Sequence, residues 1–217
     1  MFVFEFGKTT MNDVTDSLKS RRRPVQQRSI LTQGAILEAF VRLLVEKGYE
    51  RLTIRDIALV AGVGVGTLYE YFPGKKSIAA HCIQLRFSSV GNRMEAWIAD
   101  VEGKTLLQVV GYLLDQLIEM HKMHTEEWSA LIFLERQVSE KHVFQALYHK
   151  IEQFWTHAFS VSADSGNYLE KLPEVVHAAV YGVLYQTLML SPQKLHDPSF
   201  SIQLKALVIG YLQIPSS

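Results

Sequence analysis

The residues most suited to chemistry in this chain are hydrogen-bond donors that follow a short glycine-containing run. The stretch TIRDIALVAGVGVGTLYEYFPGKK begins at Thr53 and ends with Tyr69, Tyr71, Lys75 and Lys76 in close succession. Tyrosine hydroxyls and lysine ammonium groups donate hydrogen bonds to phosphate oxygens, and backbone amides at a helix start add to them. A hydrophobic core needs none of these donors, so the pattern favours a surface that binds phosphates.

Capping signals divide this stretch into two short helices that position the donors. Thr53 offers a side-chain oxygen to free backbone amides, and Asp56 follows three residues later, which predicts a helix start. Gly62 can adopt the left-handed conformation that ends a helix. A second helix is expected from about Val65 until Pro73 ends it. Two short helices joined by a small-residue turn predict a helix-turn-helix.

The second short helix has one apolar face and one face suited to DNA. Leu68 and Phe72 are one turn apart and are expected to point inward. Gly66, Thr67 and Glu70 then lie toward the opposite face. The DNA major groove is about 12 Å wide and admits such a helix, and small residues let its backbone approach the bases.

A longer helix precedes this pair, and a basic segment precedes that helix. Apolar residues recur at helical spacing from Arg28 to Lys47. Residues 1–27 are polar, lack sustained periodicity and contain three consecutive arginines from Arg21. We interpret them as a flexible basic arm, either solvated or in contact with the DNA minor groove or phosphates. Because a polar segment begins at Met11, we hypothesise that translation begins there, and the sequence leaves open whether Met1 or Met11 is the true start.

The stretch ILEAFVRLLVEKGYERLTIRDIALVAGVGVGTLYEYFPGKKSI resembles the tetracycline-repressor (TetR) family of bacterial regulators. The resemblance covers residues 28–81 and includes the Gly-Tyr turn, the Thr-Ile-x-Asp-Ile-Ala helix, the Gly-Thr-Leu-Tyr segment and the following Phe-x-x-Lys. It implies a set of DNA-contacting positions, with Thr53 near a phosphate and the others being Val65, Gly66, Thr67, Tyr69, Tyr71 and Lys75. Gly64 departs from the family, which commonly has serine or a similar polar residue there, so one side-chain phosphate contact is lost.

The rest of the chain shows helical spacing with breaks near Gly103, Gly166 and Pro192. No convincing alternating strand and no fixed-period repeat are found. The fold class is therefore expected to be all-α. An N-terminal three-helix DNA-binding domain, residues 28–80, would precede a larger helical effector-binding and dimerisation domain, residues 81–217.

Two copies of the chain are expected to act together, because one helix-turn-helix makes few base contacts. The segments LPEVVHAAVYGVLYQTLML and PSFSIQLKALVIGYL are strongly apolar. Their small residues, which allow close helix approach, are Ala179, Gly182, Ala206 and Gly210. We expect a homodimer in which two such hairpins form a four-helix bundle, as the resemblance also implies. The alternative is that both helices form only the core of their own domain.

Aromatic residues between residues 90 and 172 are candidates for an effector pocket. The four that we select are Tyr112, Trp128, Phe133 and Trp155. Aromatic side chains fill cores more often than pockets, so each of the four residues could belong either to the core or to a pocket. The resemblance implies a small-molecule effector whose binding moves two DNA-reading heads apart. The leading form of regulation is repression that the effector relieves. Activation and corepression stay open as alternatives.

The segment HKMHTEE places His121, His124 and Glu127 at three-residue steps of an expected helix. A zinc site would need a further well-placed ligand, and a solvated histidine-rich helix is the favoured interpretation. The sequence contains no Gly-x-Ser-x-Gly elbow, glycine-rich phosphate loop or His-Glu-x-x-His motif. We therefore expect no enzyme activity, no metal site and no cofactor.

Charge is unevenly distributed, although the formal net charge of the 217 residues is zero. Residues 1–80 contain 12 Lys and Arg against 8 Asp and Glu, whereas residues 81–217 contain 10 against 14. A basic front half suits a polyanion. The single cysteine fits a reducing compartment. The apolar run Val175–Leu190 is interrupted by His177 and Gln186 and is too short for a membrane span, so we expect a cytoplasmic protein.

These patterns predict a dimeric repressor that a small-molecule effector releases from an inverted-repeat operator in double-stranded DNA. The alternative is a dimeric helical ligand-binding or interaction module that has lost specific DNA binding. The sequence leaves open the effector, the operator, the regulated genes and whether one or two dimers bind each operator.

Overall fold

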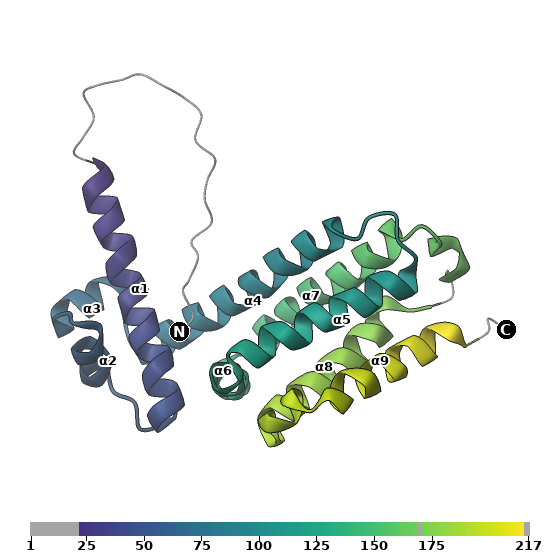
Figure 1. The fold of residues 1–217 in the computed structure, drawn as a ribbon. Coiled ribbons are helices and arrows are strands. Elements are labelled where there is room, and N and C mark those ends of the chain that lie inside the picture. The colour runs from purple at the N-terminus through teal and green to yellow at the C-terminus, as the bar shows by residue number, and fades with distance from the viewer. Residues whose placement is uncertain (1–21, 169–170, 215–217) are drawn as a thin grey trace. The chain divides into compact units, whose positions relative to one another are not determined.

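The computed structural model describes residues 22–168 and 171–214, with side chains from Gln27 onward (Figure 1). The described residues contain helices and connecting segments and no strand, which confirms the predicted all-α class. The α-helices are α1 (Arg22–Lys47), α2 (Ile54–Ala61), α3 (Val65–Tyr71), α4 (Lys75–Ala99), α5 (Leu106–Met123), α6 (Thr125–Val138), α7 (Lys141–Val161), α8 (Pro173–Leu190) and α9 (Pro198–Gln213). Two 3₁₀ helices are η1 (Ser165–Tyr168) and η2 (Pro192–His196).

The chain forms two compact units, the first ending at Ala79 and the second beginning at Ala80. Helix α4 begins in the first unit and continues into the second. The functional domain limits expected from the sequence, residues 28–80 and 81–217, stay a prediction. Among the described helices, none combines the length and the apolar composition that a bilayer crossing requires.

Helix α1 begins at Arg22, six residues before the predicted start at Arg28. Pro24 is the third residue of the helix, where its missing N–H is tolerated because first-turn amides have no intrahelical acceptor. The glutamines and arginine that follow Val25 are good helix formers. Helix α1 thus includes residues 22–27 of the expected arm, whose flexibility stays a prediction. The rest of the expected arm lies outside the described residues, as does the expected translation start.

The first unit is built around α1, which packs against α2, while α2 packs against α3. Phe40 on α1, Ile57 on α2 and Leu68 on α3 are each completely buried. Burial of a side chain of this size contributes about 1.5–3 kcal/mol. Burial of these three side chains helps to hold the two short helices against the long one.

Two local devices fix the start and the end of α2, as the sequence predicts. The Thr53 hydroxyl oxygen accepts a hydrogen bond from the Asp56 backbone amide at 3.1 Å, and the Asp56 carboxylate accepts one from the Thr53 amide at 3.3 Å. Gly62 follows the helix with φ of 68°, in the left-handed region. The chain can therefore turn within a few residues from α2 into α3.

Helix α5 is the central element of the second unit. Its buried residues recur at helical spacing along its length, and they are Leu106, Val109, Val110, Leu113, Leu114, Leu117, Ile118, Met120 and His121. It packs against α6, α7 and α9, and α8 packs against α6, α7 and α9 in turn. Figure 1 shows α5 and α7 between α4 and the α8–α9 pair.

The single helix expected across His121, His124 and Glu127 is broken at His124, which has φ of −142° and ψ of 49°. The Thr125 hydroxyl donates to backbone carbonyl oxygens at the end of α5, which competes with continuation of the helix. His121 is completely buried, so the expected solvated histidine-rich helix is wrong. Within the described residues, no group of three or more His, Cys, Asp or Glu side chains is arranged to hold a metal ion.

Gly62→Ala is expected to destabilise the chain by about 1–2 kcal/mol, because an L side chain is strained at this backbone conformation. Gly66→Ala is the matched control, since a Cβ at either glycine has no neighbour within 4 Å and Gly66 lies inside α3. It should stabilise the chain by roughly 0.5–1 kcal/mol. Urea unfolding measures both changes, and equal effects at the two positions would contradict the explanation from backbone conformation.

Candidate nucleic-acid interface and ligand cavity

Helix α3 buries one face and exposes the other. Leu68 is completely buried and Phe72 is 4% exposed, whereas Tyr69 is 53% exposed and Val65 is 39% exposed. The expected DNA-contacting residues of this helix are all exposed or half-buried, and they are Val65, Gly66, Thr67, Tyr69 and Tyr71. The exposed surface of α3 therefore presents small, hydroxyl and aromatic groups.

Gly64 is the N-cap residue of α3 and makes no side-chain hydrogen bond there. Its backbone is extended, with φ of −68° and ψ of 149°, which is the usual geometry of a cap. A Cβ at this position would lie 3.8 Å from the Thr67 hydroxyl, an ordinary contact. Space in the chain therefore does not require glycine at this position.

Thr53 is exposed, but its hydroxyl is already committed within the chain. It accepts from the Asp56 amide and donates its only proton to Asp56 Oδ2 at 2.9 Å. The hydrogen bond from Thr53 is the main cause that lowers the pKa of Asp56, with Lys47 adding a smaller effect. A hydrogen bond from Thr53 to a phosphate would require this side-chain bond to break.

Lys75 lies at the start of α4 and ties it to the segment before α2. Its Nζ donates to the backbone oxygen of Tyr49 at 2.9 Å and lies 4.3 Å from the centroid of the Tyr49 ring. A cation over an aromatic face is attracted by the ring quadrupole. The side chain therefore orders the first unit, while its remaining ammonium protons can still face a phosphate.

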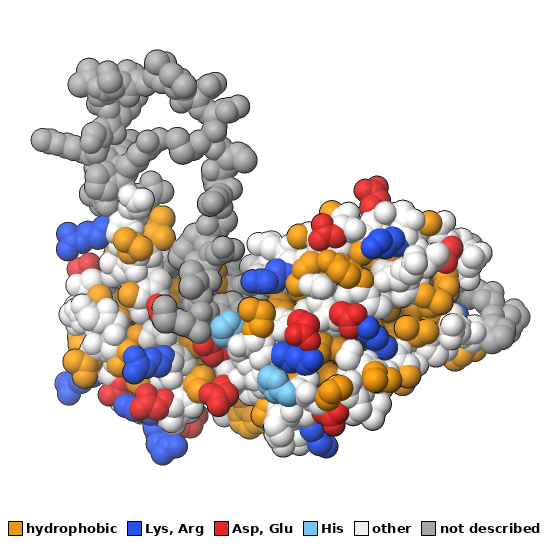
Figure 2. All heavy atoms as spheres, viewed as in Figure 1, with side chains coloured by type: hydrophobic (Ala, Val, Ile, Leu, Met, Phe, Trp, Pro, Cys, Tyr) orange, Lys and Arg blue, Asp and Glu red, His pale blue; other side chains and the backbone are white. Residues whose placement is uncertain are grey.

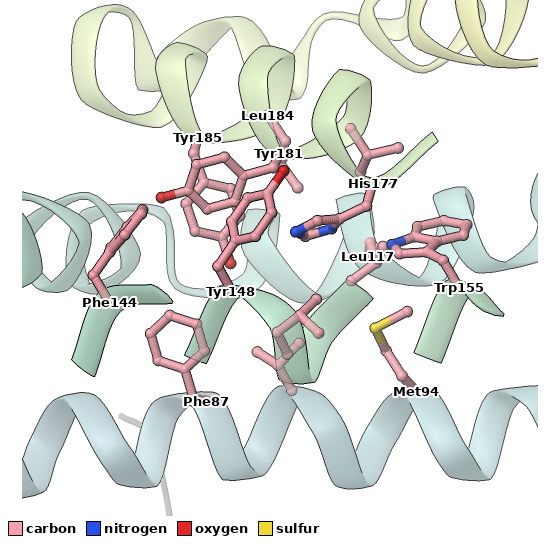
Figure 3. Close-up of a pocket in the computed structure, with 13 residues that line it drawn as sticks. Phe87, Met94, Leu117, Phe144, Tyr148, Trp155, His177, Tyr181, Leu184 and Tyr185 are labelled. Carbon is pink, nitrogen blue, oxygen red and sulfur yellow. The ribbon is translucent and has the colours of Figure 1, made fainter. Parts of the chain in front are cut away.

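The second unit contains a cavity of about 470 Å³, including the solvent at its mouth. Figure 3 shows α4 on one side and α8 on the other, with side chains of α7 between them. The lining residues are Phe87, Val90, Met94, Leu117, Phe144, Tyr148, Ile151, Trp155, His177, Val180, Tyr181, Leu184 and Tyr185. The wall is thus mainly aromatic and aliphatic.

Of the four aromatic residues expected at an effector pocket, Trp155 lines this cavity and the other three do not. The Tyr112 hydroxyl lies 3.4 Å from an oxygen of Asp100. Trp128 is buried in the core, and Phe133 is 55% exposed. The aromatic content of a segment does not specify which rings face the same space.

Sequence reasoning missed the part of α8 that faces the cavity. His177, Tyr181 and Tyr185 follow one another at four-residue intervals, which places them on one face of a helix. The Tyr148 ring lies edge-on to the His177 ring, with centroids 4.4 Å apart, and Tyr181 stacks on Tyr185 at 4.4 Å. The interval of four was the available signal, and the strong apolar character of this helix obscured it.

Two polar side chains of the cavity wall are held in their neutral forms by burial. Burial lowers the pKa of His177 to about 4, although Glu152 opposes this effect. Burial also raises the pKa of Tyr181 to about 12. At neutral pH the wall therefore offers an uncharged imidazole and an uncharged phenol.

A buried ion pair lies next to the cavity. Arg86 on α4 approaches Glu135 on α6 at 3.8 Å, and both side chains are at most 3% exposed. The Arg86 Cζ atom lies 5.0 Å from the Trp128 ring centroid and 5.4 Å from that of Tyr185, a cavity residue. Burial raises the pKa of Glu135, while Arg86 opposes the rise. Neither charged group has a hydrogen-bond partner among the described residues.

The four small residues expected at a dimer interface lie on α8 and α9. Gly182, Ala206 and Gly210 are exposed, and Ala179 is half-buried. Large apolar side chains are exposed on the same two helices, including Ile202 at 68% and others at Val175, Leu190 and Leu207. Figure 2 shows hydrophobic side chains on the surface over α8 and α9.

Comparison with known proteins gives one family match and several relatives. The model of the family described as bacterial regulatory proteins, tetR family, matches residues 36–82. The HTH-type transcriptional regulator CymR of Pseudomonas putida is 28% identical over 102 residues, which are 47% of this chain and 49% of CymR. The HTH-type transcriptional repressor KstR of Mycobacterium tuberculosis is 32% identical over 82 residues, which are 38% of this chain and 36% of KstR.

The match thus spans half or less of the length of these curated relatives. A solved structure extends the likeness over most of the chain. The transcriptional regulator FadR of Bacillus subtilis, in complex with stearoyl-CoA, has a TM-score of 0.65 at 18% identity, covering 82% of this chain and 97% of that chain. At this identity the likeness concerns the fold alone.

Glu135→Gln is expected to lower the free energy of unfolding by about 3 kcal/mol, because it leaves the buried Arg86 charge without a counter-charge. The double substitution Arg86→Met with Glu135→Leu should recover most of that loss. Asp115→Asn is the control on an exposed pair, since Asp115 contacts Lys205 at 2.6 Å, and should cost about 1 kcal/mol at most. Urea unfolding compares the three, and a small effect of Glu135→Gln would mean that the ion pair is not a stabilising contact.

Proposed function

Because the chain belongs to the TetR family of bacterial regulatory proteins, we propose that it is a DNA-binding transcriptional regulator. The exposed face of α3 carries this proposal. Gly66 lets the backbone approach base edges, Val65 suits a thymine methyl group, and the Tyr69 hydroxyl suits a phosphate oxygen. Thr67 and Tyr71 complete the surface. The excess of basic over acidic residues in the first 80 residues supports the same partner.

The regulator acts as a homodimer that binds an inverted repeat. The exposed apolar residues on α8 and α9 support this, because a helix that is apolar on more than one face needs more than one covering surface. No other atom lies within 4 Å of a Cβ at Gly182 or Gly210, so packing within the chain does not require glycine at either position. Close approach of a second copy of the chain would require glycine at these positions. Ala179 and Ala206 extend the same small surface.

A small-molecule effector in the cavity releases the operator. Helix α4 supports this coupling because one unbroken helix carries Lys75 at its start and the cavity residues Phe87 and Met94 further along. Twelve residues of helix span about 18 Å, so a shift at Phe87 is carried to the first turn. The proposed dimer has two states that differ in the spacing of its DNA-binding heads. By linkage, the effector weakens DNA binding only as far as its own affinity differs between these two states. A cytoplasmic location follows from this role.

A second candidate function is a dimeric ligand-binding module that no longer binds specific DNA. The specific observation in its favour is that the Thr53 hydroxyl and the Lys75 ammonium are both engaged within the chain. Two of the seven expected DNA contacts are therefore partly committed elsewhere. The absence of a cap side chain at Gly64 points in the same direction.

Selection of bound fragments from genomic DNA is expected to enrich an inverted repeat, whose affinity falls as salt rises because phosphate contacts release counterions. Tyr69→Phe should weaken binding to that repeat about tenfold, because it removes one hydrogen bond to a charged group and keeps the ring. Tyr112→Phe removes a hydroxyl in the second unit and should leave the affinity unchanged. Lys75→Ala is a poor probe because it also removes the Tyr49 contact.

Fluorescence anisotropy at two salt concentrations measures these affinities. If no sequence is enriched by folded, dimeric protein, the ligand-binding module becomes the preferred function. If Tyr69→Phe and Tyr112→Phe weaken binding equally, α3 is not the reading surface.

Ala206→Arg is expected to convert the dimer to monomer at micromolar concentration, because it places a charged side chain in the proposed interface. Gln84→Arg, at an exposed position on α4, is the matched control and should remain dimeric. Analytical ultracentrifugation measures the mass, and circular dichroism checks that both variants keep their helix content. A dimeric Ala206→Arg variant would contradict the proposed α8–α9 interface.

A further inference from the structure

The cavity wall contains two buried polar atoms without a hydrogen-bond partner among the described residues. These atoms are Nε2 of His177 and the hydroxyl oxygen of Tyr181. A buried polar group that lacks a partner costs about 1–3 kcal/mol. His177 is only 3% exposed and its ring extends from α8 into the space between Tyr148 and Trp155 (Figure 3). Both atoms therefore indicate where the polar part of a ligand would lie.

Both residues lie on the face of α8 that lines the cavity. His177 and Tyr181 are four residues apart on α8, and their ring centroids are 5.9 Å apart. A hydroxyl group both donates and accepts, so it can pair with the tyrosine hydroxyl and with the imidazole nitrogen in either tautomer. A carboxylate only accepts, and a hydrocarbon does neither.

Charge restricts the ligand further, because none of the thirteen lining residues is Asp, Glu, Lys or Arg. An anionic group placed at this wall would lose its hydration without gaining a counter-charge. The nearby Arg86 is not a free cation for such a group, since Glu135 already faces it at 3.8 Å. Burial keeps His177 neutral by lowering its pKa to about 4. The wall therefore favours an uncharged ligand.

The rings of the wall favour an aromatic ligand of limited size. Phe87, Phe144 and Trp155 add flat apolar surfaces to the three tyrosines. Aromatic pairs prefer offset-stacked or edge-to-face contacts, and the wall already contains both kinds. The space of about 470 Å³ includes open solvent at the mouth, so the enclosed part is smaller and favours a compact ligand.

We propose that the cavity binds a compact, uncharged phenol, whose ring packs among the aromatic side chains and whose hydroxyl hydrogen-bonds to His177 and Tyr181. The inference rests on the proposed function in one respect, since it identifies the chemical class of the proposed effector. The ligand class differs from the stearoyl-CoA of the FadR complex, which carries a long acyl chain and charged phosphates.

Isothermal titration of the full chain at pH 7.5 tests the ligand class. The probes are 4-ethylphenol and 2-naphthol, with 4-ethylbenzoate as the charged analogue of similar size and stearoyl-CoA as the long-chain alternative. Both phenols are expected to bind, and 4-ethylbenzoate should bind at least tenfold more weakly than 4-ethylphenol. Equal or tighter binding of 4-ethylbenzoate or stearoyl-CoA would overturn the proposal, as would failure of both phenols to bind.

Substitutions that keep the rings test the two hydrogen bonds. His177→Phe and Tyr181→Phe are each expected to weaken 4-ethylphenol binding about tenfold while binding of ethylbenzene changes less than threefold. Tyr112→Phe, outside the cavity, should bind both probes as the unsubstituted chain does. Equal losses for 4-ethylphenol and ethylbenzene would mean that the substitutions alter cavity shape, and the proposed hydrogen bonds would be wrong.

The DNA-binding measurements separate this inference from the proposed function. An enriched inverted repeat together with no phenol binding would reject the phenol class and leave the regulator in place. Phenol binding that depends on His177 and Tyr181, with no enriched DNA, would reject the regulator and leave the cavity assignment in place. If both hold, 4-ethylphenol should shift the operator titration, and an unchanged titration would reject its role as effector.

Discussion

Burial of α5 is the constraint around which the second unit is arranged. Its apolar residues face more than one direction, so α6, α7 and α9 all pack against it. Helix α8 then covers α6 and α7 and meets α4 across a space that large aromatic side chains line. Protein interiors are normally close-packed, with few voids larger than a water molecule. The cavity lies where side chains of α4, α7 and α8 meet Leu117 of α5.

The polar groups that the second unit buries are concentrated near the same cavity. His177 and Tyr181 line it, and the Arg86–Glu135 pair contacts Tyr185, which also lines it. Burying such groups costs free energy, and an apolar replacement of a buried ion pair is often neutral or stabilising. Stability alone therefore does not explain why these residues gather here. Perturbed, buried titratable groups in a cavity are a physical sign of a functional site.

How well the sequence predicts a structural feature depends on how far apart in the chain the interacting residues lie. The α2 cap at Thr53 and the turn at Gly62 are determined by residues three to nine positions apart, so the sequence was enough to predict them. The break at His124 depends on a Thr125 side-chain bond that competes with a helical pattern, and periodicity does not reveal it. The cavity depends on four helices meeting, which explains why Trp155 was anticipated and the α8 residues were missed. Local chemistry thus predicted the short helices α2 and α3 better than the cavity.

Helix α8 brings the two proposed functions of the second unit together on adjacent residues. Tyr181 faces the cavity, and the next residue, Gly182, is exposed on the proposed dimer surface. Because a helix is stiff along its length, a ligand that displaces Tyr181 also displaces the surface that a second copy would contact. Phe87 on the opposite wall belongs to α4, which leads back to Lys75. Under the proposed function, a ligand in this cavity would act on the proposed dimer contact and on the start of α4 at once, and either displacement would change the spacing of two DNA-binding heads.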